Sequence, residues 1–201
     1  MILLDKTYNG NEWLEIRGQI NAEIIYKAGI QTHVTIEGIE ALKPSLEVTD
    51  GIGLVIGRKG TTFNTGPLMA TIVTSIPKIV IKGQSEANIT GHINLKKLEV
   101  SGQSTAIISQ STINSIGVSG QSDVKGTVSN TTEIQVSGQS SAKLTGTFQS
   151  IEITGSGMSK ITLKGTAAQV IGSVSGMSKA KLPIDCTTIK VSASGMSEVK
   201  Y

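Results

Sequence analysis

Hydrophobic and polar residues alternate in short runs that recur along most of the chain. Each run surrounds a Gly-Gln-Ser or Gly-Met-Ser tripeptide, and the glycines are spaced by 19, 18, 18, 19, 19 and 19 residues: Gly83, Gly102, Gly120, Gly138, Gly157, Gly176 and Gly195. The fourth and sixth residues after each glycine are mostly apolar, as are the second and fourth before it. Alternation with a period of two places these side chains on one face of a strand.

A fixed short repeat is the signature of a solenoid, in which each turn buries its apolar face against its neighbours. A turn of 18 to 19 residues at about 3.3 Å each has a perimeter of about 60 Å, enough for three short strands around a thin core. The pattern therefore predicts an all-β fold, a single-stranded parallel β-helix (β-solenoid). We expect equivalent residues to stack in ladders about 4.8 Å apart. At each corner, the glycine should adopt a backbone conformation closed to other residues, and the serine hydroxyl should bond to nearby backbone.

The regularity of the repeat suggests how the chain is organised. We expect residues 1–12 to be a frayed N-terminal segment and residues 13–201 to form a single β-solenoid domain. Within it, residues 13–75 should form irregular turns and residues 76–201 the regular repeats. Leu14 to Ile24, around Gly18-Gln19, reproduce the pattern and are interpreted as an early turn.

Two further segments carry local signals. Asp50-Gly51 is a strong tight-turn signal between two apolar runs. Arg58 to Gly66 contains three Thr, two Gly and Asn64 ahead of Pro67, and this composition predicts an exposed loop. No break in composition is sharp enough to indicate a second domain.

Charge and composition narrow the classes of function. The net charge of +3 combines −2 over residues 1–75, with six Lys or Arg and eight Asp or Glu, and +5 over residues 76–201, with twelve Lys and seven acids. This excess is too weak for a nucleic-acid protein, in which clustered Arg and stacking aromatics are expected, and aromatics make up only 3%. The sequence contains no run of 18 apolar residues, so it predicts no helix that spans a membrane. The single Cys186 excludes an intrachain disulfide and is expected to face the core.

The order of these segments is similar to that of a known family. Leu14 to Ile25 form a strand with a glycine, Val34 to Gly38 follow as Val-x-Ile-x-Gly, and Leu46 to Gly51 form a strand and turn. A Pro-containing strand at Ile72 to Ile81 and serial Ser-Gly-x-Ser strands complete the pattern. Over residues 13–201 the chain resembles the putative auto-transporter adhesin head domain family, or GIN domain. The resemblance implies an exported or surface-anchored bacterial β-solenoid of unestablished activity.

Catalytic chemistry has few candidates in this sequence. Glu86 and Asp123 fall on one outward face two turns apart, hence about 9.5 Å, near the upper end of the spacing in inverting glycosidases. His33 and His92 have no partner at a known metal-ligand spacing, and no Ser has a base placed to activate it. We expect no catalytic residues, no metal and no cofactor, and a polysaccharide-active enzyme is the less favoured alternative.

Two outward sets of residues are candidates for binding. Lysines at the third and fifth positions after the corner glycines gather near the C-terminal end and form a candidate face for an anionic polymer such as an acidic glycan or lipopolysaccharide: Lys143, Lys160, Lys179, Lys181 and Lys200. The alternative for these lysines is a solvated surface that keeps the protein soluble. The second set, Met158, Met177 and Met196, is a candidate stripe for self-association into a homo-oligomer. The alternative for these methionines is that they fold back over the corner within one chain.

Three functions remain open at this stage. The first is a non-catalytic structural or adhesion-type module that presents a repetitive face to a glycan or protein. The second is the enzyme that Glu86 and Asp123 would require. The third is a cytosolic, phage-encoded binding or sequestering protein, since Met1 to Lys6 carry no secretory signal. The family resemblance favours the cell envelope or the extracellular space, and the missing signal favours the cytoplasm.

Overall fold

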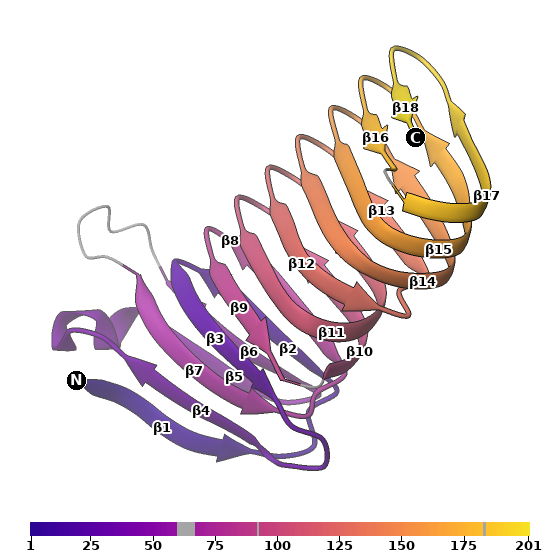
Figure 1. Cartoon of the computed structure of the whole chain (residues 1–201). Coiled ribbons are helices and arrows are strands. Elements are labelled where there is room, and N and C mark those ends of the chain that lie inside the picture. The colour runs from indigo at the N-terminus through magenta and orange to yellow at the C-terminus, as the bar shows by residue number, and fades with distance from the viewer. Residues whose placement is uncertain (60–66, 92, 183) are drawn as a thin grey trace.

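The computed structural model describes residues 1–59, 67–91, 93–182 and 184–201. Its strands wind in stacked parallel coils, so the predicted β-solenoid is confirmed (Figure 1). The elements are β1 (Ile2–Tyr8), β2 (Trp13–Gly18), β3 (Ile20–Tyr26), β4 (Thr32–Glu37), the 3-10 helix η1 (Glu40–Ser45), β5 (Leu46–Asp50), β6 (Gly53–Arg58), β7 (Leu68–Thr74), β8 (Lys78–Gly83), β9 (Glu86–Thr90), β10 (Ile93–Val100), β11 (Thr105–Val118), β12 (Asp123–Ser129), β13 (Glu133–Val136), β14 (Ser141–Gly155), β15 (Lys160–Val174), β16 (Lys179–Lys181), β17 (Ile184–Ala193) and β18 (Glu198–Lys200). Within the described ranges, no helix is long and apolar enough to span a bilayer.

Each regular coil contains two strand segments that meet at the Gly-x-Ser corner. The segments before the corners pair in parallel from one coil to the next, and so do the segments after them. Equivalent residues are direct partners: Ala106 pairs with Ala87 on one side and Val124 on the other. All three side chains are completely buried. The period-two pattern therefore identified the inward face.

The corner explains why glycine and serine recur. Gly102 has a φ of +86°, and a Cβ at this position would lie 2.6 Å from the carbonyl oxygen of Gly83 on the preceding coil. A side chain is thus excluded by both backbone conformation and space. Ser85 is 3% exposed, and its hydroxyl donates to the carbonyl oxygens of Gly18 at 2.7 Å and Lys82 at 2.9 Å. These contacts confirm the corner roles predicted for Gly and Ser.

The first coil of the sequence is not the first coil in space. Strand β2 pairs in parallel with β8 on one side and with β6 on the other, and β3 lies in the same way between β9 and β7. Leu14, for example, is opposite Ile79 and Leu54. The coil formed by β6 and β7 therefore stacks beneath the coil that precedes it in the chain.

Antiparallel strands cover the outer side of that lowest coil (Figure 1). Strand β5 folds back on β6 through the turn at Asp50-Gly51, and β4 pairs with β7. The expectation that residues 1–12 are frayed is wrong for Ile2–Tyr8, which forms β1 and pairs antiparallel with β4. The physical reason is burial, because Leu3 and Tyr8 are only 9% and 3% exposed.

The predicted loop from Arg58 to Gly66 also begins too early. Arg58 is the last residue of β6, is 7% exposed and donates a hydrogen bond of 3.1 Å to the side-chain oxygen of Gln19. The remainder of that prediction, residues 60–66, lies outside the described residues. Cys186 is half-buried against the core in the last coil, and its thiol donates to the carbonyl oxygen of Thr188.

Candidate functional site

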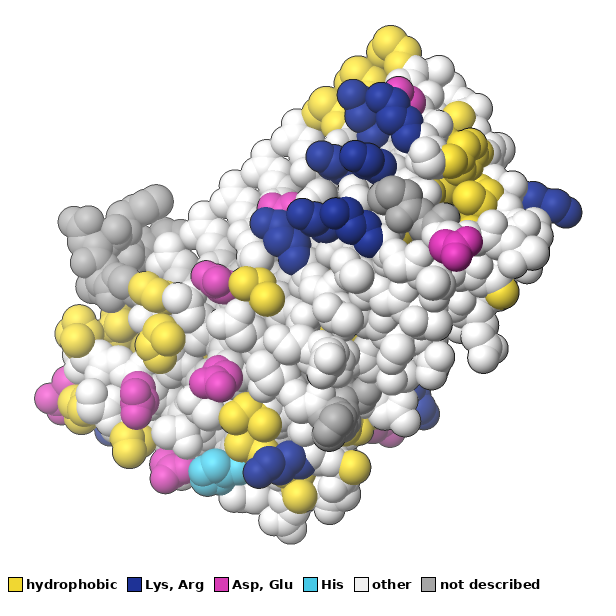
Figure 2. Space-filling model, in the orientation of Figure 1, with side chains coloured by type: hydrophobic (Ala, Val, Ile, Leu, Met, Phe, Trp, Pro, Cys, Tyr) yellow, Lys and Arg dark blue, Asp and Glu magenta, His cyan; other side chains and the backbone are white. Residues whose placement is uncertain are grey.

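The most strongly charged surface lies on the strand segments that follow the corners in the C-terminal half. Figure 2 shows Lys side chains gathered in a band across the upper part of one face, beside hydrophobic side chains at its upper edge. This lysine band, as we call it, is carried by β12, β14, β15, β16 and β18 and consists of exposed side chains: Lys125, Lys143, Lys160, Lys164, Lys179, Lys181 and Lys200.

Strand register brings the lysines into direct opposition. Three pairs are direct partners on neighbouring strands: Lys125 with Lys143, Lys160 with Lys179, and Lys181 with Lys200. Neighbouring strands are about 4.8 Å apart, and like charges in opposite positions destabilise a sheet. The lysine band therefore concentrates positive charge on one surface, although repulsion between the ammonium groups destabilises the sheet.

Two acids belong to the same surface. The ammonium group of Lys200 donates a hydrogen bond of 2.9 Å to the carboxylate of Glu198. This bond holds the pKa of Glu198 below its ordinary value of 4.5. The carboxylate of Asp123 accepts a hydrogen bond from the hydroxyl of Ser141. In the part of the chain that the structure describes, Lys200–Glu198 is the one ion pair within the band. The other six lysines of the band form no ion pair with the described residues.

The centre of the band is hollowed into a groove of about 380 Å³. Five lysines line it, namely Lys125, Lys143, Lys160, Lys164 and Lys181, together with Asp123, Ser141, Ala142 and Thr162. Thr162 points outward yet is 7% exposed. The aliphatic stems of the neighbouring lysines cover Thr162, while their ammonium groups stay in water.

The structure brings together the five lysines that the sequence singled out and adds Lys125 and Lys164. Lys125 is the fifth residue after Gly120, the position already shared by Lys143 and Lys181, so the repeat contained the signal needed to find it. Lys164 is the seventh residue after Gly157, beyond the positions compared in the sequence.

Side chains at the position directly after the corner glycine form two different ladders. In the N-terminal coils, each glutamine amide donates to the oxygen of the next, at 3.1 Å from Gln19 to Gln84 and at 2.9 Å for each later step to Gln103, Gln121 and Gln139. In the last three coils the same position holds Met158, Met177 and Met196, which are 48%, 48% and 77% exposed. We call these three residues the methionine stripe.

The other candidates from the sequence lie elsewhere on the solenoid. Glu86 and Asp123 both pair with Thr105, which separates them by one strand on the sheet surface. Among the described pockets, none is lined by both acids. His33 contacts Asp5 at 2.9 Å and Thr7 at 3.1 Å on the antiparallel end, and His92 lies outside the described residues. Among described side chains, no group of three His, Cys, Asp or Glu could hold a metal ion.

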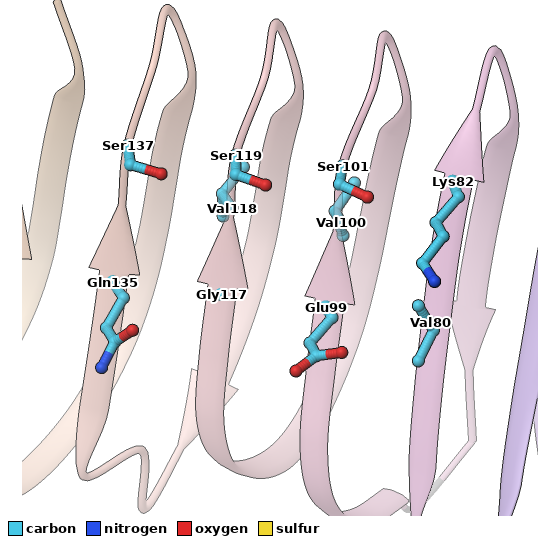
Figure 3. Close-up of a pocket in the computed structure, with 10 residues that line it drawn as sticks. All are labelled: Val80, Lys82, Glu99, Val100, Ser101, Gly117, Val118, Ser119, Gln135 and Ser137. Atoms are coloured by element: carbon cyan, nitrogen blue, oxygen red, sulfur yellow. The ribbon is translucent and has the colours of Figure 1, made fainter. Parts of the chain in front are cut away.

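A smaller depression of about 230 Å³ lies on the strand segments that precede the corners. There, Gly117 leaves a gap between Glu99 and Gln135 (Figure 3). Glu99 receives a hydrogen bond of 2.7 Å from Lys97, and this bond is the main reason that its pKa lies below 4.5. The carboxylate is therefore ionised at neutral pH and is not suited to act as a general acid.

Comparisons with known proteins agree with the geometry. The chain is similar to crystal structures of putative adhesins from Bacteroides fragilis NCTC 9343 (15% identity, TM-score 0.67, covering 98% of this chain and 94% of that one) and from Parabacteroides distasonis ATCC 8503 (13%, 0.61, 98% and 95%). It is also similar to a protein from P. distasonis described as a putative lipid binding protein (13%, 0.51, 98% and 96%). These likenesses concern the fold.

No curated protein matched the sequence. A family model, however, matches residues 13–201, nearly the whole chain. The chain therefore belongs to the family described as putative auto-transporter adhesin, head GIN domain.

Proposed function

We propose that this protein is a non-catalytic, adhesion-type module of the bacterial cell envelope whose lysine band binds an acidic polymer such as an acidic glycan. One observation carries the proposal: seven exposed lysines lie on neighbouring strands of one sheet, and of these seven only Lys200 forms an ion pair with a described residue, Glu198. Membership in an adhesin family supports the adhesive role and the location at the cell envelope.

The geometry suits a polymer better than a small ion. Lysines repeat along the solenoid axis at about 4.8 Å per coil, so an extended chain of anionic groups could contact several of them at once. Each contact is weak in water, but linked contacts add through effective concentration. Binding of this kind should weaken as salt rises, because exposed charges are screened.

The non-catalytic part of the proposal is supported by the placement of the acids. Glu86 is exposed on the sheet surface, and Asp123 is engaged by Ser141. Glu99 has a depressed pKa and lies on the opposite strand segments. Paired carboxylates that cleave glycosidic bonds need one member with a raised pKa, whereas the pKa of Glu99 is lowered.

Binding of fluorescent heparin, with neutral dextran as the comparison polymer, tests the proposal at low and high salt. The variant Lys143→Gln/Lys181→Gln should lose about tenfold in heparin affinity, or about 1.4 kcal/mol. The matched control Lys96→Gln/Lys190→Gln removes the same charge from exposed positions outside the band and should bind as the wild type does. Equal losses in both variants, or equal binding of dextran and heparin, would contradict the proposal.

A further inference from the structure

The methionine stripe is not required by the fold. Its backbone N–H groups donate to the glycine carbonyls of the preceding coil at 2.8 Å in Met158, Met177 and Met196. The N–H group of Gln121 makes the equivalent bond at 2.7 Å. The corner therefore accepts a glutamine, with its self-bonding amide, equally well. Three consecutive coils nevertheless expose a thioether in its place, and exposed apolar rows of this kind mark binding surfaces.

The stripe runs directly alongside the lysine band. Met158 is two residues before Lys160, and Met177 is two residues before Lys179, so each pair projects from the same corner and the strand that leaves it. Both members of each pair are exposed. The result is one continuous surface with an apolar edge and a cationic field, and Figure 2 shows hydrophobic side chains bordering the lysines at the upper end of the molecule.

We propose that this combined surface docks on an anionic lipid bilayer. Lysine ammonium groups would lie against the lipid phosphates, and the three methionines would enter the boundary between headgroups and acyl chains. Peripheral proteins combine the same two contributions, apolar burial and attraction to anionic lipid. The proposal rests on the proposed function, since it requires the lysine band to bind anions, and it adds anionic lipid headgroups to the acidic polymers that the band would bind.

Charge complementarity favours a bilayer over a second copy of the chain. A two-fold contact through the methionine stripe would place the same surface of both copies together. The adjoining lysine bands would then approach each other, and like charges at an interface oppose association. An anionic bilayer covers the same methionines while neutralising the lysines.

Sedimentation with lipid vesicles tests the inference on the full chain. The vesicles are phosphatidylcholine alone, or phosphatidylcholine and phosphatidylglycerol in a ratio of about seven to three. The wild type should bind the anionic vesicles and not the neutral ones. The variant Met158→Gln/Met177→Gln/Met196→Gln should bind anionic vesicles about tenfold more weakly, because partial burial of three methionines is lost, yet bind heparin as the wild type does. Met69→Gln, at an exposed methionine on β7, is the matched control and should bind vesicles normally.

The outcomes separate this inference from the proposed function. Loss of heparin binding in Lys143→Gln/Lys181→Gln together with unchanged vesicle binding in the methionine variant would overturn the bilayer proposal alone. Failure of the wild type to bind anionic vesicles while it binds heparin would overturn it as well. A methionine variant that binds vesicles normally but has a lower mass by light scattering would show that the stripe is a self-association interface instead. Failure of the wild type to bind heparin would refute the proposed function itself.

Discussion

The side-chain amide of Gln19 donates a hydrogen bond of 3.1 Å to that of Gln84, although 65 residues separate them in the chain. The contact exists because the coil of β2 and β3 lies directly against the coil of β8 and β9. From Gln84 the ladder continues through the next three glutamines, and Arg58 donates to Gln19 at its other end. A polar seam therefore joins coils that are distant in sequence to those of the regular repeat.

Interrupting this seam should destabilise the solenoid slightly. The Gln103→Ala variant loses the hydrogen bonds of 2.9 Å that Gln103 makes with Gln84 and Gln121. The neighbouring amides are exposed and can form hydrogen bonds with water instead. We therefore expect the free energy of unfolding to fall by only about 1 kcal/mol. Urea denaturation measures the change, and Gln149→Ala, at an exposed position outside the ladder, should change it by less. An identical loss in both variants would mean that the ladder does not stabilise the fold.

The corner glycines should tolerate no side chain. In Gly102→Ala the new Cβ would lie 2.6 Å from the Gly83 carbonyl oxygen at a φ of +86°. We expect a loss of about 1–3 kcal/mol in the free energy of unfolding from backbone strain, and more from the clash. Gly117→Ala is the control, because its Cβ would meet nothing closer than the Cγ of Glu99 at 3.9 Å. Thermal unfolding of the two variants checks the prediction, which requires Gly102→Ala to melt well below Gly117→Ala.

Adjacent positions on β14 should respond in opposite ways to a negative charge. Leu144 is completely buried, and Leu144→Asp would place an unpaired carboxylate in the thin core, which should prevent folding. Leu163, equally buried and its partner on the next coil, should behave in the same way. Lys143 is exposed, and Lys143→Asp should fold. Circular dichroism and urea midpoints measure the contrast, and matching midpoints for Leu144→Asp and Lys143→Asp would show that the facing of the strand is misassigned.

Stability should depend on pH through Glu99. Its folded-state pKa is below its ordinary value of 4.5, mainly because Lys97 donates a hydrogen bond to it. Its contribution is therefore complete above pH 4.5 and is lost as the pH falls through the folded-state value. Glu99→Gln should thus destabilise the protein most at neutral pH, and the difference from wild type should shrink in acid. Urea titrations at neutral and acidic pH test this, and a difference that stays constant would contradict it.

Most of the lysine band could be predicted from the repeat alone. A strict spacing of 18 to 19 residues assigns each lysine a position after its glycine, and stacking then predicts which lysines are neighbours. Lys164 was not predicted, because lysine occurs at the seventh position after the corner glycine in this repeat alone and forms no pattern there. The burial of Thr162 required coordinates, because coverage by neighbouring side chains depends on their packing as well as on register.

The β-solenoid, its inward face and its corners could be read from the amino-acid sequence, because they follow from local alternation, chain reversal and a repeat in which every coil meets a near copy of itself. The order of coils at the N-terminal end, where β2 lies between β6 and β8, became known from the three-dimensional structure. The same is true of β1, which pairs with β4 instead of fraying. Apolar alternation on β2 is compatible with any similar strand as its neighbour, so the choice depends on how the intervening residues fold back, a non-local property that no repeat records.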